Sequence, residues 1–223
     1  NVLESAKILG LEQILITSTS ETYGTAQKIP IDENHPHVGQ SPYSASKIGA
    51  DQLAISYFKS FELPVKIVRP FNTYGPRQSA RAIIPTIVSQ LLSGNSAIEL
   101  GNITPTRDLT YVLDTCEGFS SIFQSSAFFG SATNIGTNSE ISIEELVKLI
   151  GSLLDVDVKI ITSKERKRPK LSEVERLVCD NSKLVQNSAW KPKYDLESGI
   201  KEFISWMKNP KILQIYKSLR YNV

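Results

Sequence analysis

The chain has 223 residues, of which 40% are hydrophobic and 22% are charged, and its formal net charge is +2. This balance is typical of a globular protein with a substantial core and argues against a disordered chain. The basic residues are spread along the sequence, apart from a short cluster at residues 164–168, so we expect no nucleic-acid partner. The two cysteines, Cys116 and Cys179, cannot form a disulfide framework.

Neither a membrane segment nor a metal site is predicted. The most apolar stretch, residues 82–88, contains Pro85 and is far shorter than the roughly 20 residues that a membrane span requires. No signal peptide is visible, so we expect a cytoplasmic location and no membrane partner. His35 and His37 flank Pro36 in a polar loop without a cysteine or carboxylate array at the spacing of metal ligands.

The first part of the chain alternates between helical and extended patterns. We expect a helix at its start, an apolar strand at residues 13–16, and an irregular loop at residues 25–42 that contains three prolines. Further elements are expected in this order: helix 43–61, strand 65–68, helix 83–92, strand 97–100, extended residues 107–112, helix 113–124 and strand 131–135.

From Ser142 onward the pattern becomes mostly helical. Ser142 and Glu145 have the spacing of a capping box and predict the start of an amphipathic helix. A strand at residues 156–161, a charged loop to about residue 178 and a final helix at residues 196–207 are expected to follow.

Tyr43 and Lys47 are the first candidates for chemistry. They lie four residues apart in the predicted helix 43–61, and this spacing puts both side chains on one face. A lysine ammonium near a tyrosine favours the phenolate, which lowers the tyrosine pKa from about 10 and lets the oxygen accept a proton from a substrate hydroxyl. Any helix with this spacing matches the pattern, so a surface pairing is the alternative interpretation.

Polar residues follow two of the predicted strands. Residues 17–24 bring hydroxyls and the carboxylate of Glu21 directly after strand 13–16, and residues 69–77 follow strand 65–68. In open parallel α/β sheets, ligands bind outside the carboxyl ends of the strands. These segments are therefore candidates for a shared site, although Glu21 could also serve only to accept hydrogen bonds from loop amides.

Four motifs in this order resemble the extended short-chain dehydrogenase/reductase family of NAD-dependent nucleotide-sugar epimerases and dehydratases. They are Thr-Ser-Glu-x-Tyr-Gly at residues 19–24, Ser-Pro-Tyr-x-x-Ser-Lys at 41–47, Arg-Pro-Phe-Asn-x-Tyr-Gly-Pro-Arg at 69–77 and Thr-Arg-Asp at 106–108. The resemblance implies an α/β fold, the C-terminal part of a Rossmann-like doubly wound parallel sheet with a smaller, mostly helical substrate-binding lobe. Residues 1–135 would belong to the dinucleotide-binding domain, with a substrate-lobe insertion at about 76–106, and residues 136–223 mainly to the lobe.

The resemblance also implies roles for individual residues. The implied catalytic residues are Thr19, Ser20, Glu21, Tyr43 and Lys47, with Tyr43 as the base and Lys47 also on the cofactor ribose. The cofactor would be NAD, contacted by Thr17, Tyr43, Lys47, Pro70 and Phe71. The nucleotide-sugar substrate would be bound by Asn72, Arg81, Arg107 and Arg168, although Arg168 could equally lie in a solvated loop. Relatives dimerise through the helix that matches residues 43–61, so a homodimer is expected.

One family feature has no counterpart in the sequence. The fold opens with a glycine-rich turn that receives the dinucleotide pyrophosphate, but no two of the twelve glycines have Gly-x-Gly spacing. We therefore expect the chain to begin about a hundred residues into a typical domain of the family. The first strand would then lie at an edge of the sheet and expose Ile14 and Ile16. A nucleotide-sugar-binding protein without the cofactor half is the non-enzymatic alternative.

The identity of residues 19–21 bears on which reaction the resemblance implies. In similar 4,6-dehydratases a carboxylate at the position of Glu21 removes the C5 proton. At the preceding position most hexose 4,6-dehydratases carry an aspartate, where this chain has Ser20. Serine there points to dehydratases of UDP-N-acetylglucosamine or to uronate decarboxylases, and a 4-epimerase is a third option. Residues 41–47 resemble dehydratases more closely than decarboxylases. Residues 77–81 and 168–176 look like the UDP-N-acetylglucosamine 4,6-dehydratases of legionaminic acid synthesis, so we expect that lyase activity.

Overall fold

The computed structural model describes residues 1–163, 166 and 169–216. Its main sheet has three parallel strands in the order β1 (Ile14–Thr17), β2 (Val65–Pro70) and β7 (Ala132–Ile135). Ile16 pairs with Ile67, which pairs in turn with Ala132. Strand β2 is central and almost wholly buried, as is typical of a parallel sheet that is covered on both faces.

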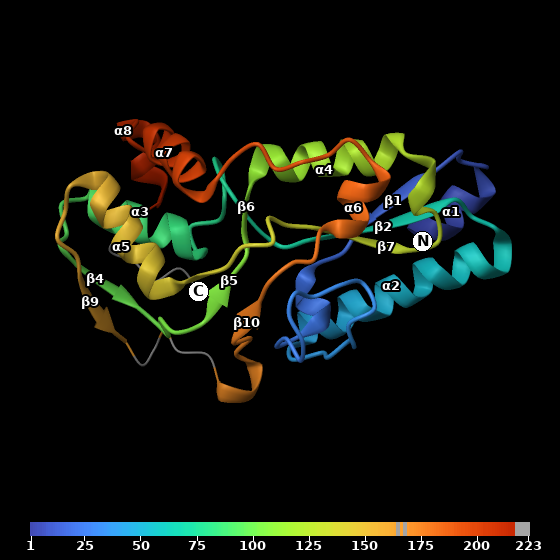
Figure 1. Ribbon diagram of the computed structural model, residues 1–223, viewed down its shortest axis with the longest axis horizontal. Coiled ribbons are helices and arrows are strands. Elements are labelled where there is room, and N and C mark those ends of the chain that lie inside the picture. The colour runs from blue at the N-terminus through green and yellow to red at the C-terminus, as the bar shows by residue number, and fades with distance from the viewer. Residues whose placement is uncertain (164–165, 167–168, 217–223) are drawn as a thin grey trace.

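Helices cover both faces of this sheet (Figure 1). On one face α2 (Pro42–Phe61) packs its Ala54 against Val65 and Ile67, and α1 (Val2–Ile8) contacts α2. On the other face lie α4 (Val112–Gln124) and α6 (Ser182–Asn187), whose Ile122 and Leu184 pack with Val68 of β2. The three layers confirm the predicted Rossmann-like α/β class.

Local sequence sets the start of α2. The Ser41 Oγ accepts the N–H of Ser44 at 3.1 Å, and the Ser44 Oγ accepts the N–H of Ser41 at 3.1 Å, which forms a capping box. Pro42 occupies the first turn, where its missing N–H costs nothing. These contacts hold Tyr43 in the first turn of the helix.

The second lobe lies at the left of Figure 1 and encloses its own hydrophobic core. Its elements are α3 (Ile83–Leu92), β4 (Ala97–Leu100), α5 (Ile143–Leu154), β9 (Lys159–Thr162), α7 (Leu196–Met207), α8 (Pro210–Leu213) and η5 (Gln214–Tyr216). Strand β4 runs parallel to β9, with Ile98 opposite Ile160. A capping box between Ser142 and Glu145 starts α5, as predicted.

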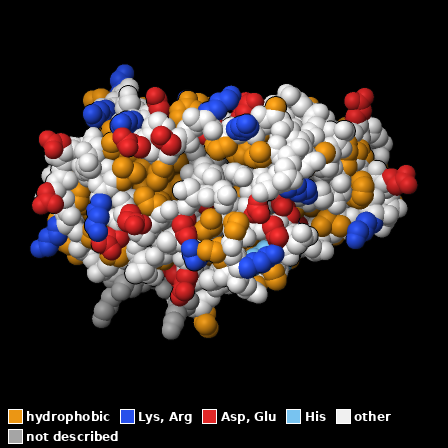
Figure 2. Space-filling view, in the orientation of Figure 1, with side chains coloured by type: hydrophobic (Ala, Val, Ile, Leu, Met, Phe, Trp, Pro, Cys, Tyr) orange, Lys and Arg blue, Asp and Glu red, His pale blue; other side chains and the backbone are white. Residues whose placement is uncertain are grey.

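Short strands lie between the main sheet and this lobe. Strand β3 (Asn72–Tyr74) pairs with β6 (Leu109–Tyr111), and β10 (Arg176–Leu177), β5 (Thr106–Arg107) and β8 (Ile141–Ser142) form a sheet in that order. Three single-turn helices complete the described elements: η1 (Ser20–Tyr23), η2 (Ser126–Phe128) and η4 (Lys170–Ser172). No described helix is long and apolar enough to cross a membrane. On the face shown in Figure 2, positive and negative side chains are interspersed with hydrophobic ones.

The structure confirms most expected elements and corrects several. The helices at 83–92 and 196–207 and the strand at 97–100 have the predicted bounds. The helix at 196–207 is not the last one, because α8 follows it, and α6 was not predicted. The expected strand at 156–161 begins only at Lys159, and the supposed loop to residue 178 contains β10, whose two residues form a strand only by pairing with β5. Strand β1 lies at the edge of its sheet, but Ile14 and Ile16 are partly buried against the core.

Candidate active site

A tight turn follows β1 and carries Glu21. The Thr19 Oγ1 accepts the N–H of Glu21 at 3.2 Å, and the Thr22 hydroxyl donates to the Thr19 carbonyl at 2.9 Å. Gly24 ends η1 with a φ of 63°, and a Cβ there would lie 2.6 Å from the Gln40 side chain, so the position requires glycine. The turn η1 contacts α2, which brings Glu21 beside the helix that carries Tyr43.

Tyr43 and Lys47 lie in α2, and the Lys47 side chain reaches the end of β1. The Lys47 ammonium donates a hydrogen bond to the Thr17 carbonyl at 3.0 Å and lies 6.0 Å from the centroid of the Tyr43 ring. The Tyr43 side chain is half exposed, at 51% of its maximum, so a ligand can reach its phenol. The sequence spacing therefore places an ammonium near an accessible phenol, as predicted.

The end of β2 completes this edge of the sheet. The Phe71 side chain is buried and tilted against Tyr23, so only the main chain of Phe71 is available to a ligand at this edge. Between the ends of β1 and β2, Ser18 donates its N–H to the Val68 carbonyl at 2.7 Å. Its hydroxyl is buried and has no hydrogen-bond partner among the described residues. Pro70 lies next to Phe71 and is partly buried.

A cavity of about 490 Å³ is lined by residues of β3, β5 and α3, among others. Its lining includes three of the four predicted substrate-binding residues. Asn72, Arg81 and Arg107 all line it, together with Arg166 and Glu173. The Arg107 guanidinium lies 3.4 Å from the Glu173 carboxylate and also donates to the Thr106 carbonyl at 2.8 Å. Arg166 lies 3.7 Å from the carboxylate of Glu99. Three guanidinium groups against these two carboxylates still favour an anionic ligand, and planar donors suit phosphate oxygens.

The neighbouring Asp108 fixes the position of Arg107. Its buried carboxylate accepts N–H groups from Thr137 at 2.8 Å, Asn138 at 2.9 Å and Cys179 at 3.1 Å. Burial raises the pKa of Asp108, and these hydrogen bonds act in the opposite direction. The strand that carries Arg107 is thus anchored to two separate loops of the chain.

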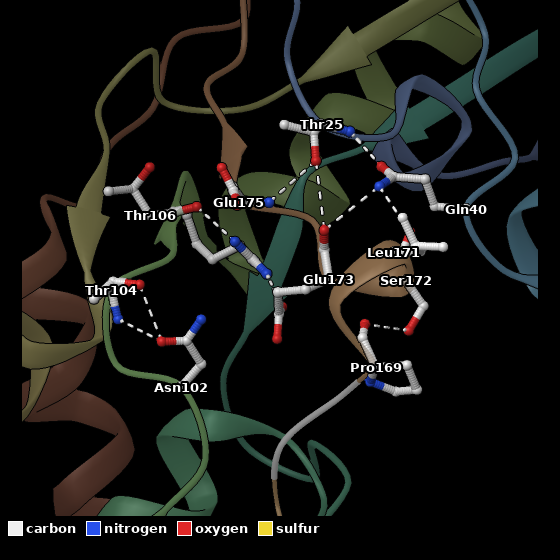
Figure 3. A network of polar contacts seen from close by, with 11 residues as sticks. Thr25, Gln40, Asn102, Thr104, Thr106, Pro169, Leu171, Ser172, Glu173 and Glu175 are labelled. Atoms are coloured by element: carbon white, nitrogen blue, oxygen red, sulfur yellow. Dashed lines mark hydrogen bonds and ion pairs between the residues drawn. The ribbon is translucent and has the colours of Figure 1, made fainter.

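Hydrogen bonds also join this cavity to the loop before α2 (Figure 3). The Gln40 side-chain amide donates to the carbonyls of Leu171 at 3.3 Å and Glu173 at 3.4 Å, while its oxygen accepts the N–H of Thr25 at 2.5 Å. The Thr25 hydroxyl in turn accepts the N–H of Glu175 at 3.2 Å. The segment that carries Glu173 is therefore tied to the loop that runs from Glu21 to Tyr43.

An ion pair supports the small sheet beside the cavity. Arg176 donates to both oxygens of Glu140, from its Nε at 2.9 and 3.0 Å, and the Thr106 hydroxyl donates to Glu140 at 2.5 Å. The Arg176 guanidinium lowers the pKa of Glu140. A second cavity, of about 760 Å³, is also lined by Arg107 and Glu140.

The structure brings most of the predicted residues into two neighbouring groups. Thr17, Thr19, Ser20, Glu21, Tyr43 and Lys47 lie around the end of β1, and Asn72, Arg81 and Arg107 line one cavity. Ser20 is buried in its turn. Arg168 lies outside the described residues. In the described part of the chain, no three His, Cys, Asp or Glu residues form a group that could hold a metal ion.

Sequence reasoning missed the residues that connect these groups. Gln40 directly precedes the Ser-Pro-Tyr motif, and Glu173 lies within the stretch 168–176 that was noted for its resemblance. The contacts of Gln40 with Leu171 and Glu173 could not be predicted from the sequence, because these partners are more than a hundred residues away along the chain.

Comparisons with known proteins agree with this geometry. The family model described as GDP-mannose 4,6 dehydratase matches residues 1–203. A putative UDP-glucose 4-epimerase of Methanocaldococcus jannaschii is 31% identical over 94% of this chain and 67% of its own length. A dTDP-glucose 4,6-dehydratase of Xanthomonas campestris is 31% identical over 87% of this chain, which spans only 57% of that relative.

Solved structures extend the similarity to three dimensions. The dTDP-glucose 4,6-dehydratase of Bacillus anthracis in complex with NAD matches 97% of this chain and 68% of its own, with a TM-score of 0.86 and 30% identity. The UDP-glucuronic acid 4-epimerase of Bacillus cereus, in complex with UDP-glucuronic acid and NAD, matches 93% of this chain and 65% of its own, with a TM-score of 0.85 and 25% identity. The chain therefore belongs to the extended short-chain dehydrogenase/reductase family of nucleotide-sugar epimerases and dehydratases.

Proposed function

We propose that this chain is part of an NAD-dependent nucleotide-sugar 4,6-dehydratase, a lyase that acts on a UDP-hexose, specifically UDP-N-acetylglucosamine. The main support is the placement of Glu21 on a turn that contacts α2, the helix that carries Tyr43 and Lys47. A dehydratase needs a carboxylate beside its phenol base, whereas a 4-epimerase has no clear use for one. The similarity to dTDP-glucose 4,6-dehydratases supports the same reaction class.

The residues at the ends of β1 and β2 fit an NAD cofactor. The Lys47 ammonium has three donors and gives one of them to the Thr17 carbonyl, so it can also donate to a ribose hydroxyl. The buried Ser18 hydroxyl has no hydrogen-bond partner in the described part of the chain. Thr17, Pro70 and the main chain of Phe71 would complete the contacts. When bound there, NAD would supply hydride transfer, away from the sugar C4 in the first step and back to C6 after water has been lost.

Tyr43 is the base that we assign to the first step. Its phenol oxygen takes the proton of the sugar 4-hydroxyl. The Lys47 ammonium lies 6.0 Å from the centroid of the Tyr43 ring. Thr19 accepts the N–H of Glu21 at its Oγ1, which leaves its O–H free to donate to the sugar oxygen. The hydroxyl therefore orients the substrate while Tyr43 removes the proton.

Glu21 is the base that we assign to the elimination step. The C5 proton becomes acidic only once C4 is a ketone, and the Glu21 carboxylate then takes it. Loss of the C6 hydroxyl as water requires a proton. Serine is too weak an acid to give it, and Ser20 is also buried, so Glu21 in its protonated form is the proposed donor.

The cavity lined by Arg81, Arg107 and Asn72 is the proposed site of the substrate diphosphate. A guanidinium can donate two parallel hydrogen bonds to phosphate oxygens. Arg107 already donates to Glu173 and to the Thr106 carbonyl, and these contacts hold it at the cavity. We propose that Arg168 adds a further contact. A homodimer through α2 completes the proposal, since Leu53 and Phe61 of this helix are more than half exposed.

The similarity to a putative UDP-glucose 4-epimerase favours 4-epimerisation as the second candidate function. Mass spectrometry of the full-length protein incubated with UDP-N-acetylglucosamine separates the two. The proposal expects the loss of one water, whereas an epimerase yields an isomer of unchanged mass. Loss of carbon dioxide from UDP-glucuronate, with no change in the acetamido sugar, would instead show a decarboxylase.

The variant Glu21→Gln adds a test of the mechanism. The full-length variant should still reduce bound NAD with this substrate but release little 4-keto-6-deoxy sugar, because only the later step needs the carboxylate. The charge-matched control Glu12→Gln, at an exposed position, should behave as the wild type. Normal product release by Glu21→Gln would contradict the role of Glu21.

A further inference from the structure

A buried arginine lies beneath the candidate active site. Arg69 is the residue before Pro70 in β2, and its side chain is only 2% exposed. Its Nε and Nη2 both lie 2.9 Å from the Asp51 Oδ2, and its Nη1 donates to the Tyr23 hydroxyl at 2.8 Å. One guanidinium thus holds two side chains from different elements.

Those two side chains come from the elements that carry the proposed bases. Asp51 is fully buried in α2 and lies four residues after Lys47, on the same face of the helix. Tyr23 is fully buried in η1 and lies two residues after Glu21. The Tyr23 hydroxyl also donates to the Asn134 Oδ1 at 2.7 Å, which ties η1 to strand β7.

The chemistry of the contact suits a fixed geometry. A guanidinium is planar and always charged, so its donors point in fixed directions from three nitrogens, whereas the three donors of a lysine ammonium lie on one nitrogen and can rotate. The guanidinium carbon lies 5.0 Å from the Tyr23 ring centroid, within cation–π range. Burial raises the pKa of Tyr23, so its hydroxyl stays neutral and can accept from Arg69 while it donates to Asn134.

We propose that Arg69 is a positioning residue that sets the separation between Glu21 and the Tyr43–Lys47 pair, through its contacts with Tyr23 and Asp51. The roles of Glu21 and Tyr43 in this statement rest on the proposed function. The geometric part does not, because it concerns only how η1 is held against α2. If the network served only general stability, loss of the Tyr23 hydroxyl would act like loss of any other buried tyrosine hydroxyl.

Tyr23→Phe tests this with little change of shape. The matched control is Tyr74→Phe, since Tyr74 is equally buried and its hydroxyl donates to the Leu196 carbonyl at 3.2 Å. The first measurement is amide hydrogen exchange, followed by mass spectrometry, in peptides that cover η1. The Thr22 and Gly24 amides, which donate to carbonyls within the turn, should exchange at least about fivefold faster in Tyr23→Phe and at the wild-type rate in Tyr74→Phe.

The second measurement follows the two chemical steps in the full-length protein. Tyr23→Phe should slow the release of dehydrated sugar by about tenfold or more, because small displacements of a reacting group are costly. Reduction of bound NAD in a single turnover should slow by less than about threefold, since Asp51 still holds α2. Arg69→Lys should reproduce both effects, because the donors of an ammonium all lie on one nitrogen, whereas the contacts of Arg69 are made from its Nε, Nη1 and Nη2.

The outcomes separate this proposal from the proposed function. The role of Arg69 would be overturned if Tyr23→Phe matched Tyr74→Phe in both amide exchange and product release. Equal slowing of both chemical steps with unchanged amide exchange would also overturn it. If the wild-type protein releases no dehydrated sugar, the proposed reaction is wrong, and the exchange measurement alone then decides whether Arg69 positions η1.

Discussion

At the scale of single residues, Tyr43 is the side chain on which the proposed chemistry depends most. Its phenol is exposed at the end of β1, and Tyr43→Phe removes the oxygen while it leaves the packing of α2 unchanged. We expect turnover of the full-length protein to fall by roughly 10² to 10⁴ at an unchanged melting temperature, as for removal of a general base. Tyr57→Phe, farther along the same helix, is the control and should keep wild-type turnover. Wild-type turnover in Tyr43→Phe would contradict the assignment.

Arg107 is the residue through which the cavity between the lobes can be tested without the reaction. It lies on β5, where Asp108 anchors the strand, and its guanidinium faces the cavity. Arg107→Met should weaken the binding of UDP, measured by calorimetry, by about tenfold to a hundredfold, because hydrogen bonds between charged groups contribute about 1.5–3 kcal/mol. Arg77→Met makes the same charge change outside this cavity and should leave UDP affinity within about twofold. Equal UDP affinities of the two variants would contradict the proposal that this cavity binds the diphosphate.

At the scale of elements, Lys66 fixes the end of α4 against the main sheet. Its buried ammonium in β2 donates to the carbonyls of Ile122 at 2.9 Å, Phe123 at 3.0 Å and Ser125 at 2.6 Å, where the dipole of the helix favours a cation. Burial lowers the pKa of this lysine. Its side-chain nitrogen still donates hydrogen bonds to all three carbonyls.

Lys66→Met leaves those carbonyls without a buried donor and should lower the free energy of unfolding by about 1–3 kcal/mol. Urea unfolding measures the change. Lys59→Met, at an exposed position of α2, should stay within about 0.5 kcal/mol of the wild type. A similar small effect for Lys66→Met would mean that the helix end is satisfied in another way.

Elements with a strong local signal were predictable, and elements that depend on distant partners were not. The helices at 83–92 and 196–207 have their predicted bounds because their apolar residues recur at helical spacing. The expected extended stretch at residues 107–112 covers β6 and one residue of β5. Strands β3, β8 and β10 have only two or three residues each, so no periodicity can reveal them, and they exist through pairing between segments far apart in sequence.

The same distinction applies to the candidate site. The spacing of Tyr43 and Lys47 predicted their shared face. The family resemblance implied that Asn72, Arg81 and Arg107 bind one substrate, and all three line one cavity. The links from Gln40 to Leu171 and from Arg69 to Tyr23 and Asp51 could not be predicted, because they depend on how the folded elements approach one another. The predicted boundary between the two lobes at residue 135 stays a prediction.

At the scale of the whole molecule, the proposed homodimer can be tested directly by measuring the mass of the protein in solution. Leu53 is 58% exposed on α2, where a partner copy would cover it. Light scattering should give the mass of two chains for the wild-type protein and of one chain for Leu53→Lys. Leu171→Lys, at a position that is 89% exposed on η4 rather than on α2, should remain a dimer. A monomeric wild type, or a dimeric Leu53→Lys, would contradict the proposed interface.

The hydrogen bonds that join Thr25 and Gln40 to residues 171–175 also bear on the order in which the protein folds. These partners are separated by 131 to 150 positions along the chain. During synthesis, which adds roughly 5–20 residues per second, the loop between Glu21 and Tyr43 therefore cannot form these hydrogen bonds until residues 171–175 have left the ribosome. Closure of so large a loop is entropically costly, so the proposed catalytic region is expected to become ordered only after the helices around it have formed.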